Sequence, residues 1–266
     1  DNLGCTYIDS VTITEPQPLN FNFSQTNVSC NGLSDGQTSV IVTGGSLPYS
    51  YSWSNGDTDS LNTGIVAGTY ILTVTDNQGC IFLDSVIITE PLVLALTTTD
   101  SDVLCFGGNT GSSTVHTAGG TPNYTYSWSP SGGSDSTALG LSIGVYQVIV
   151  NDVNNCTDSI TVTINEPTVL TVSTTQSEVS CFNGSDGEVV ALPLGGAVPY
   201  TYLWSNGDTD SIADAIIVGN YTVTVTDING CIIIDNTTVT EPTELISNVN
   251  NSVNVGCFGG NNGSAL

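Results

Sequence analysis

The sequence contains no lysine and no arginine, against 25 aspartate and glutamate residues and one histidine, so its formal net charge is -25 at pH 7. A chain without cationic side chains cannot neutralise phosphates, which excludes ordinary nucleic-acid binding. It is also poorly suited to adhere to anionic lipid by charge. Surface salt bridges are impossible, but exposed ion pairs contribute only about 0–1 kcal/mol each, so the fold loses little.

Other features are missing as well. There is no methionine, no signal peptide, and no apolar run near the ~20 residues of a membrane helix. Strong helix signals are also lacking. Because the chain starts and stops within a repeated pattern, we interpret it as a window of a longer processed array.

The sequence also offers little for catalysis. His116 is the sole candidate for a general base near neutral pH. It lies in STVHTAGG, where strand alternation predicts a surface histidine. No arginine clamp, lysine Schiff base or GxSxG motif is available, so we expect no enzyme and no catalytic residue.

What the chain does contain is a tandem repeat. YSWSNGDTDS at 51–60 returns as YLWSNGDTDS at 202–211, and YSWSPSGGSDS at 126–136 lies between them. Glu-Pro ends at Pro16, Pro91, Pro167 and Pro242, which gives a period of about 76 residues. We predict complete repeats at 16–91, 92–167 and 168–242. Residues 1–15 would be the tail (strand G) of a preceding repeat, and residues 243–266 the head of a following one.

Within each repeat the hydrophobic period is two, which predicts strands. In YTVTVTD, for example, Tyr221, Val223 and Val225 share one face. Asn229-Gly230 between two such runs predicts a hairpin with a type I′ turn, which needs positive φ at both central residues. Gln78-Gly79 and Asn154-Asn155 occupy the same place in the other repeats.

Short strands with turns every 8–12 residues predict an all-β fold of tandem immunoglobulin-like β-sandwiches, arranged end to end as a rod. The run before the first cysteine would be strand A, GQTSVIVTGG strand B, PYSYSW strand C, the GTYxxxV run strand F, and the run after the next cysteine strand G. A tryptophan on strand C and a tyrosine-corner residue on strand F would anchor each small core. These predicted anchors are Trp53, Trp128, Trp204, Tyr70, Tyr146 and Tyr221.

CNGLSDGQTSVIVTGGSLPYSYSWSNGDTDS, followed by AGTYILTVTDNQGC and an ITEP ending, resembles the SprB repeat of large surface adhesins of gliding Bacteroidetes. The third repeat matches equally well, whereas CFGGNTGSSTVHTAGG in the second lacks the aspartate and has a longer turn. The resemblance covers essentially the whole chain. It implies export by the type IX secretion system and display at the bacterial cell surface, but not that this chain drives gliding.

Eight regularly spaced cysteines in a polar chain indicate disulfides and an oxidising, extracellular setting. Three pairings fit the period: within a repeat (Cys30–Cys80, Cys105–Cys156, Cys181–Cys231), across the Glu-Pro linker (Cys80–Cys105, Cys156–Cys181), and between successive repeats. In a sandwich the A–B loop and the F–G turn lie at opposite ends, about 20–25 Å apart, whereas a disulfide needs Cα atoms within about 7 Å. This favours the third pairing, Cys30–Cys156 and Cys105–Cys231. Cys5, Cys80, Cys181 and Cys257 would then pair with repeats outside the window.

Calcium is the one cofactor that the sequence brings into consideration. Asp57, Asp59, Asp208 and Asp210 recur in turns, as do Asp35 and Asp186, and hard cations prefer carboxylate and carbonyl oxygens. No twelve-residue loop with a terminal glutamate accompanies them. The alternative is an aspartate that hydrogen-bonds the backbone of its own turn.

Asp-Ser followed by an apolar residue or threonine recurs at two positions per repeat and resembles the O-glycosylation sequon of exported Bacteroidetes proteins. The candidate serines are Ser10, Ser60, Ser85, Ser136, Ser159 and Ser211. In the third repeat the second copy is broken, because Asp235 is followed by Asn236. Glycans there would shield strand edges that have no lysine to protect them.

We therefore interpret the chain as a non-enzymatic extracellular stalk or fibre of a cell-surface adhesin. Its partners would be neighbouring repeats of the same long chain, other copies in a filament, and a surface or glycan receptor that the sequence does not identify. Two alternatives remain. A self-assembling structural filament is opposed by like charge, and a carbohydrate-binding module array would expose Tyr49, Tyr124 and Tyr200 on one flank.

Overall fold

The computed structural model describes residues 3–248, 250, 252–261 and 263–265. Residues 1–2 of the predicted leading tail, and 249, 251, 262 and 266 of the predicted trailing head, lie outside the described residues. The described residues form strands, turns and loops but no helix, so none forms a helix able to cross a membrane. The chain divides into two compact units. The first comprises Asp1–Asp100, Ser113–Ala138 and Val145–Val162, and the second Ser101–Ser112, Leu139–Gly144 and Thr163–Leu266.

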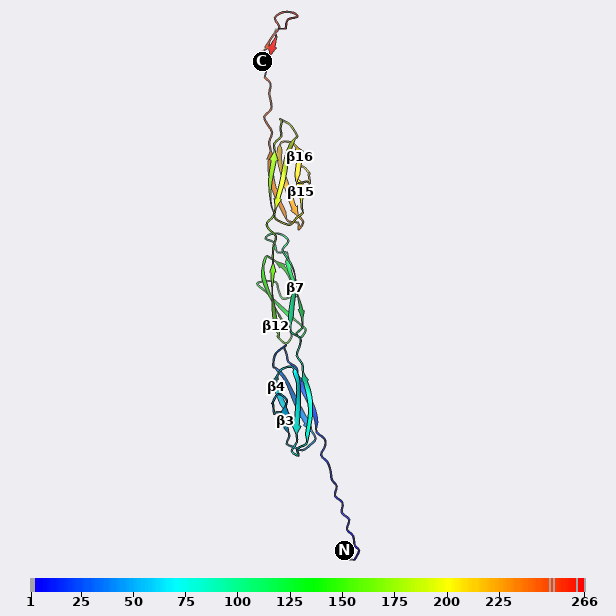
Figure 1. The fold of residues 1–266 in the computed structure, drawn as a ribbon. Coiled ribbons are helices and arrows are strands. Elements are labelled where there is room, and N and C mark those ends of the chain that lie inside the picture. Colours follow the sequence, from blue (N-terminus) through cyan, green and yellow to red (C-terminus); the bar gives the residue numbers. More distant parts are fainter. Residues whose placement is uncertain (1–2, 249, 251, 262, 266) are drawn as a thin grey trace. The chain divides into compact units, whose positions relative to one another are not determined.

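The first repeat contains six strands in two antiparallel sheets (Figure 1). They are β1 (Asn20–Thr26), β2 (Gly36–Thr43), β3 (Ser50–Trp53), β4 (Leu61–Ile65), β5 (Gly68–Thr75) and β6 (Ile81–Ile88). One sheet has the order β1-β2-β4 and the other β3-β5-β6. In immunoglobulin terms these are the A-B-E and C-F-G sheets, so the predicted fold class is confirmed.

The other two repeats have the same strand orders, β10-β8-β7 with β12-β11-β9, and β13-β14-β16 with β15-β17-β18. The middle repeat contains β7 (Ala95–Ser101), β8 (Gly111–Ala118), β9 (Thr125–Ser129), β10 (Thr137–Leu141), β11 (Gly144–Asn151) and β12 (Thr157–Ile164). The third contains β13 (Thr171–Ser177), β14 (Gly187–Leu194), β15 (Tyr200–Trp204), β16 (Ile212–Ile216), β17 (Gly219–Asp227) and β18 (Ile232–Val239). The predicted strands A, B, C, F and G are all present. Strand E (β4, β10, β16) was not predicted.

In the two flanking segments, the residues that the structure describes do not form the two three-stranded sheets of a repeat. Residues 3–19 form no strand, and the assignment of residues 1–15 to strand G of a preceding repeat stays a prediction. A strand G needs strand F of its own repeat as hydrogen-bond partner, and the described chain supplies none for this segment. Towards the other end, β19 (Ser252–Val253) pairs with β20 (Ser264–Ala265).

The predicted anchors lie in the cores. Trp53, Trp128 and Trp204 are buried, as are Tyr70, Tyr146 and Tyr221. Each indole N–H donates to the carbonyl of the aspartate in the following Asp-Ser pair, at 2.9 Å to Asp59 O and 3.0 Å to Asp210 O. The Tyr70 hydroxyl donates to Val66 O at 2.9 Å, four residues upstream, as in a tyrosine corner.

The hairpin turns between strands F and G differ from the type I′ prediction. In the first repeat Gly79 N donates to Asp76 O and Asp76 N donates to Cys80 O, each at 3.0 Å. Positive φ occurs only at the last residue of the four-residue turn, which is Gly79, Asn155 or Gly230. This matches a longer hairpin loop with a single left-handed residue. The prediction was wrong because it placed Asn-Gly at the two central positions of the turn, whereas the glycine is the last of its four residues.

Strand E contains one position whose backbone requires φ > 0. Gly64 and Gly140 have φ of 70°, and the equivalent residue in the third repeat is Ala215 with φ of 53°. An L-residue in this region costs roughly 1–2 kcal/mol relative to the right-handed region, and glycine avoids that cost.

We predict that Ala215→Gly stabilises the third repeat by about 1 kcal/mol, and that Gly64→Ala destabilises the first repeat by a similar amount. Native-state hydrogen exchange of the β14 and β2 amides would measure each effect within its own repeat. A loss of protection in β14 on Ala215→Gly would contradict this account of the strand.

Candidate functional site at the disulfide junctions

Two disulfides join successive repeats. Cys30 bonds to Cys156 with a Cα–Cα distance of 5.6 Å, and Cys105 bonds to Cys231 with 5.7 Å. Each links the A–B loop of one repeat to the F–G turn of the next, 126 residues further along the chain. This is the inter-repeat pairing that the spacing favoured, and the within-repeat pairing of Cys30 with Cys80 is wrong. Cys80, Cys181 and Cys257 are exposed free thiols, and Cys5 is also exposed.

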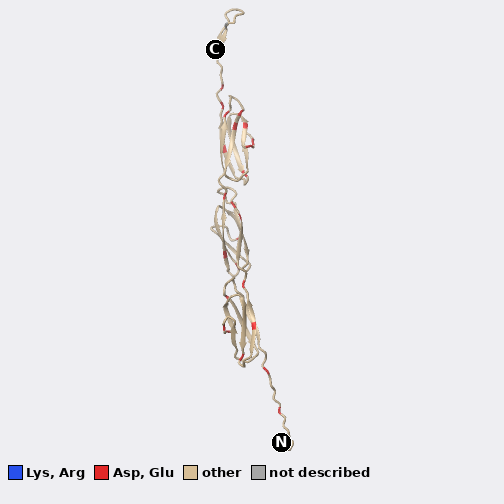
Figure 2. Ribbon diagram, viewed as in Figure 1, with Lys and Arg blue, Asp and Glu red and all other residues tan. Residues whose placement is uncertain are grey.

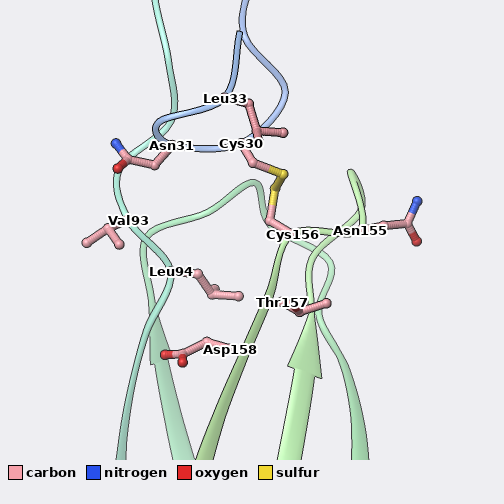
Figure 3. A pocket seen from close by; sticks show the side chains of 9 residues that line it. All are labelled: Cys30, Asn31, Leu33, Val93, Leu94, Asn155, Cys156, Thr157 and Asp158. Carbon is pink, nitrogen blue, oxygen red and sulfur yellow. A yellow bond between two sulfur atoms is a disulfide. The ribbon is translucent and has the colours of Figure 1, made fainter. Parts of the chain in front are cut away.

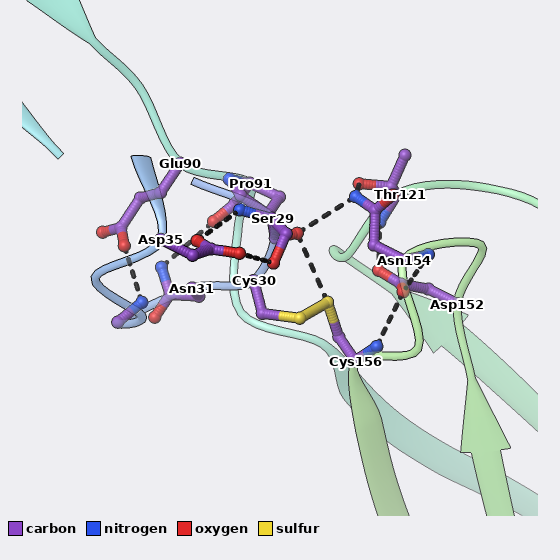
Figure 4. Close-up of a disulfide and its surroundings, with 11 residues drawn as sticks. Ser29, Cys30, Asn31, Asp35, Glu90, Pro91, Thr121, Asp152, Asn154 and Cys156 are labelled. Carbon is purple, nitrogen blue, oxygen red and sulfur yellow. Dashed lines mark hydrogen bonds between the residues drawn. A yellow bond between two sulfur atoms is a disulfide. The ribbon is translucent and has the colours of Figure 1, made fainter. Parts of the chain in front are cut away.

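Hydrogen bonds accompany the first disulfide (Figure 4). The Asn154 amide, in the F–G turn, donates to Ser29 O at 3.0 Å and to Thr121 Oγ1 at 3.1 Å. The second junction repeats the contact, because Asn229 donates to Leu104 O at 3.0 Å. In both cases the acceptor is the carbonyl of the residue before the loop cysteine. The junctions are therefore equivalent in their polar contacts as well as in their disulfides.

Each junction also contains a hollow beside the disulfide (Figure 3). At the first junction, Cys30, Asn31 and Leu33 from the loop line it together with Val93, Leu94 and residues 155–158. At the second, Cys105 and Phe106 line it with Val169, Leu170 and residues 230–233. At the first junction the loop residue after the cysteine is the polar Asn31, and the strand that follows the F–G turn contributes Thr157 and Asp158. At the second junction the corresponding loop residue is the aromatic Phe106, and that strand contributes Ile232 and Ile233.

The A–B loop is held in shape by its own repeat. Val28 is buried, and its N–H donates to Thr89 O at 3.0 Å. Glu90, of the Glu-Pro linker, accepts from Gly32 N at 2.6 Å, and Glu166 and Glu241 accept equivalently from Gly107 N and Asn183 N. The linker glutamate thus fixes the loop that carries the cysteine, a role that the sequence analysis did not foresee.

Asp35 and Asp186 close the same loop. Asp35 accepts from the N–H and hydroxyl of Ser29, and Asp186 does so from Ser180. The hydroxyl and backbone bonds from Ser29 hold the pKa of the Asp35 carboxyl below its usual value. The middle repeat has Thr110 here, whose hydroxyl accepts from Leu104 N at 2.8 Å. These aspartates therefore follow the turn-forming alternative in their contacts.

The F–G turn is organised by a buried aspartate at the end of strand F: Asp76, Asp152 or Asp227, called here the hub aspartates. Asp227 Oδ1 accepts from Asn229 N and Cys231 N, each at 2.9 Å, and its Oδ2 accepts from Ala197 N in the B–C loop at 2.9 Å. Asp76 and Asp152 make the same three bonds. The hub thus joins the cysteine-bearing turn to the B–C loop.

These bonds lower the pKa of the hub carboxyls. For Asp152 and Asp227 burial by itself raises the pKa, but the backbone N–H donors outweigh it, and the net pKa lies below the usual value. For Asp76 the bond from Cys80 N is the largest cause of the lowered pKa. The carboxylate form is therefore the one that the fold stabilises.

The Gly-Gly pair of the B–C loop is required by this arrangement. A Cβ on Gly195 would lie 2.0 Å from Val169 O, and one on Gly196 would lie 2.7 Å from the Asp227 carboxylate. A Cβ on either glycine of Gly44-Gly45 or of Gly119-Gly120 would clash in the same way. The Gly-Gly motif before strand C is therefore required because the backbone there passes close to the hub aspartate and to the start of strand A.

The aspartates considered for calcium lie in exposed turns of the first and third repeats. Asp57 Oδ1 accepts from Asp59 N at 2.9 Å, and Asp208 Oδ1 accepts from Asp210 N at 3.1 Å. Among the residues that the structure describes, no group of three or more His, Cys, Asp and Glu is arranged to hold a metal. Calcium binding stays a prediction.

The candidate serines lie on the surface. Ser10, Ser60, Ser85 and Ser159 are exposed, whereas Ser136 and Ser211 are half-buried. Ser85 lies on β6 and Ser159 on β12, each at an edge of its sheet. In three of the Asp-Ser pairs, the aspartate carbonyl accepts the N–H of the core tryptophan, so the aspartate has a structural role. The serines of these pairs are Ser60, Ser136 and Ser211.

The tyrosines that would have favoured sugar stacking are half-buried and bonded. Tyr49, Tyr124 and Tyr200 donate to Gly44 O, Gly119 O and Gly195 O at 2.5, 2.7 and 2.6 Å. They brace the B–C loop, so the flank does not present free aromatic faces. His116 is exposed on β8, with Nε2 3.0 Å from Thr99 Oγ1, the surface position that the alternation predicted.

We predict that Asp227→Asn lowers the melting temperature at neutral pH by several degrees, because an amide nitrogen cannot accept the Ala197 N–H. A carboxyl with a lowered folded pKa contributes stability that is fully present above its unfolded pKa, about 3.9. That contribution disappears as the pH falls through the folded value. The variant should therefore lose part of the acid sensitivity of the wild type below about pH 4. Exposed Asp214→Asn is the matched control, and equal melting curves for the two variants would contradict the hub role.

Comparison with known proteins finds a family match in each repeat. The SprB repeat model matches residues 22–58, 97–133 and 173–209, and no curated protein matches. Among solved structures, three immunoglobulin domains of a mutated titin variant show 13% identity, with a TM-score of 0.39, covering 85% of this chain and 99% of that one. The first eight immunoglobulin domains of Down Syndrome Cell Adhesion Molecule show 10% identity and a TM-score of 0.36, covering 86% of this chain and 45% of that one. The SprB repeat model therefore matches once within each of the three six-stranded repeats of this chain.

Proposed function

We propose that this chain is a non-enzymatic, load-bearing stalk segment of a bacterial cell-surface adhesin, providing length and stiffness for attachment or gliding. The observation that carries the proposal is the pair of disulfides between successive repeats, since a spacer under tension benefits from covalent links at its junctions. The Glu-Pro linker supports it, because proline restricts the backbone on both sides of its peptide bond. The remaining cysteines, Cys5, Cys80, Cys181 and Cys257, would make the same bond with repeats outside this chain.

For its setting we infer export by the type IX secretion system and display outside the cell. SprB repeats and disulfides fit an oxidising, extracellular environment. The complete absence of Lys and Arg removes every tryptic cleavage site, which suits an exposed protein (Figure 2). The half-buried, bonded tyrosines support a stalk over a carbohydrate-binding array.

The two disulfide loops overlap in sequence, because Cys105 lies between Cys30 and Cys156. The shortest covalent path through the chain therefore crosses both bonds and bypasses much of the polypeptide. We predict that reduction lengthens the fully unfolded, stretched molecule by on the order of 500 Å, at roughly 3.4 Å per residue. Single-molecule force spectroscopy with handles at the two ends measures this length.

The control for that experiment is the double variant Cys30→Ser with Cys105→Ser, whose stretched length should not respond to reductant. If the wild type extends equally in the oxidised and reduced states, the disulfides carry no load and the stalk proposal is wrong.

We also propose that the exposed Asp-Ser serines carry O-linked glycans. The mass of the protein taken from its native surface should then exceed the mass of the bare sequence, and Ser60→Ala or Ser85→Ala should each remove one increment. Ser54→Ala, an exposed serine without a preceding aspartate, is the control. An intact mass equal to that of the unmodified chain would exclude the modification.

A further inference from the structure

Two turns of this chain have the same sequence but different surroundings. WSNGDTDS occurs at 53–60 and again at 204–211, and it contains an Asn-Gly step, which is Asn55-Gly56 in the first repeat and Asn206-Gly207 in the third. The two glycines have nearly the same backbone, with φ of 94° and 95°, and both steps are exposed. A difference in reactivity between the two asparagines must therefore come from the fold and not from the local sequence.

An asparagine followed by glycine can lose its side-chain amide without an enzyme. The glycine nitrogen gives its proton to hydroxide and attacks the asparagine Cγ, and the Cγ–Nδ2 bond then breaks. The departing nitrogen takes a proton from water and leaves as ammonia, so hydroxide is regenerated. Water opens the resulting five-membered ring to aspartate or isoaspartate. Glycine favours the attack because it has no Cβ in the way. The amide must first leave its hydrogen bonds and turn its carbon towards the glycine nitrogen.

In the first repeat a buried partner holds the amide of Asn55. Asn55 Nδ2 donates to Asn62 Oδ1 at 3.1 Å, and Asn62 Nδ2 donates back to Asn55 Oδ1 at 3.2 Å. Asn62 lies on β4 and is fully buried. Asp57 N also donates to Asn55 Oδ1, at 3.3 Å. Turning the Asn55 amide would leave the buried amide of Asn62 without these bonds, which is costly.

In the third repeat alanine takes the place of that partner. Ala213 is the second residue of β16, as Asn62 is of β4, and its methyl group cannot bond an amide. Asn206 Oδ1 accepts from Asp208 N at 3.1 Å, which corresponds to the bond from Asp57 in the first repeat. The reciprocal pair of amide bonds is thus replaced by a methyl group, and the Asn206 amide can turn at lower cost.

The attacking nitrogen is held equally in both turns. The N–H of Gly56 donates to Trp53 O, and the N–H of Gly207 donates to Trp204 O, each at 2.9 Å. Opening of the turn to free this nitrogen is therefore required in both repeats. The two sites differ at the amide that is attacked.

Neighbouring charge acts in the opposite direction. Glu188 and Asp214 line a hollow together with Asp208 of the third-repeat turn, whereas Gln37 and Thr63 occupy their places in the first repeat. Additional carboxylates repel hydroxide and so slow the removal of the glycine proton. Moderate salt screens this effect between exposed charges, whereas it leaves the hydrogen bonds of a buried amide in place.

We propose that Asn206 is a site of spontaneous deamidation and that the Asn55–Asn62 pair protects the same sequence in the first repeat. Isoaspartate at position 206 adds one carbon to the main chain. That carbon lies within the turn that the Trp204 N–H closes on Asp208 O at 2.8 Å, so the modification disturbs the turn next to the core tryptophan. This change takes place within one repeat and is independent of the stalk proposal.

The test follows both asparagines in the same molecule. The full chain, with its disulfides intact, is kept in moderate salt at physiological temperature and mildly alkaline pH. Peptic peptides, cut in acid, reveal deamidation by the mass gained when an amide becomes a carboxyl, and peptides that extend to Ser52 or Leu203 distinguish the two turns. Asn206 should react about tenfold faster than Asn55, because the paired amide bonds are absent from its site. In denaturant with reductant the two rates should be equal.

A substitution in the first repeat tests the role of the partner. Asn62→Ala gives this repeat the residue of the third, and Asn55 should then react at about the rate of Asn206. The matched control is Asn22→Ala, an exposed residue on β1, which should leave the Asn55 rate unchanged. Hydrogen exchange of the β5 amides shows whether the repeat stays folded in each variant.

A reciprocal variant tests the same point if Asn62→Ala unfolds the first repeat. Asn62 faces Thr38 across strands B and E, and Ala213 faces Val189 at the same place in the third repeat. The double variant Val189→Thr with Ala213→Asn rebuilds the first-repeat arrangement. It should slow deamidation of Asn206 towards the rate of Asn55.

Equal rates for Asn55 and Asn206 in the folded chain would overturn the proposal. A folded Asn62→Ala variant in which Asn55 stays slow would do the same, as would a folded double variant in which Asn206 reacts at its original rate. Once isoaspartate has formed, the Trp204 amide should exchange with solvent faster than before. Unchanged exchange at this amide would show that the modification leaves the turn intact, contrary to the proposed effect.

Discussion

The carboxylate bonded to backbone N–H groups is the interaction on which the rest of this structure depends. The chain has no lysine or arginine, so no carboxylate can be neutralised by a permanent cation. The hub aspartates, the loop aspartates and the linker glutamates instead accept backbone N–H bonds, which are strong when the acceptor is charged. They fix the F–G turn, the A–B loop and the linker end, and these three segments are the ones that meet at each disulfide.

Variation in the middle repeat shows that the requirement is for an acceptor rather than for charge. Thr110 replaces the loop aspartate and still accepts from the backbone at the same place. The turn after Trp128 is longer, yet the indole N–H still finds the carbonyl of Asp135, at 2.9 Å. Each repeat thus tolerates different residues as long as the backbone group at that point is satisfied.

The sequence predicted the period, five of the six strands and the core anchors, because these depend on local alternation and on large apolar side chains. It also favoured the observed cysteine pairing, because strand length sets the separation between the ends of a sandwich. The hub aspartates were missed because an aspartate before a turn looks like any turn residue. Its burial comes from the B–C loop, about 30 residues away in sequence (compare Ser46 with Asp76). Strand E was missed for a related reason, since Gly64 interrupts an alternation that is only five residues long.

The disulfides also determine how tension would pass through one repeat. The A–B loop connects the strands of the A-B-E sheet, whereas the F–G turn connects strands of the C-F-G sheet. In the stalk that we propose, a repeat held by its F–G turn at one junction and by its A–B loop at the other would therefore be loaded across its two sheets. Only the interior between the sheets, and the chain segments that cross it, can transmit that load. The tryptophan on strand C and the tyrosine on strand F lie in this interior, so the residues that hold the small core together are also the ones that resist separation of its sheets.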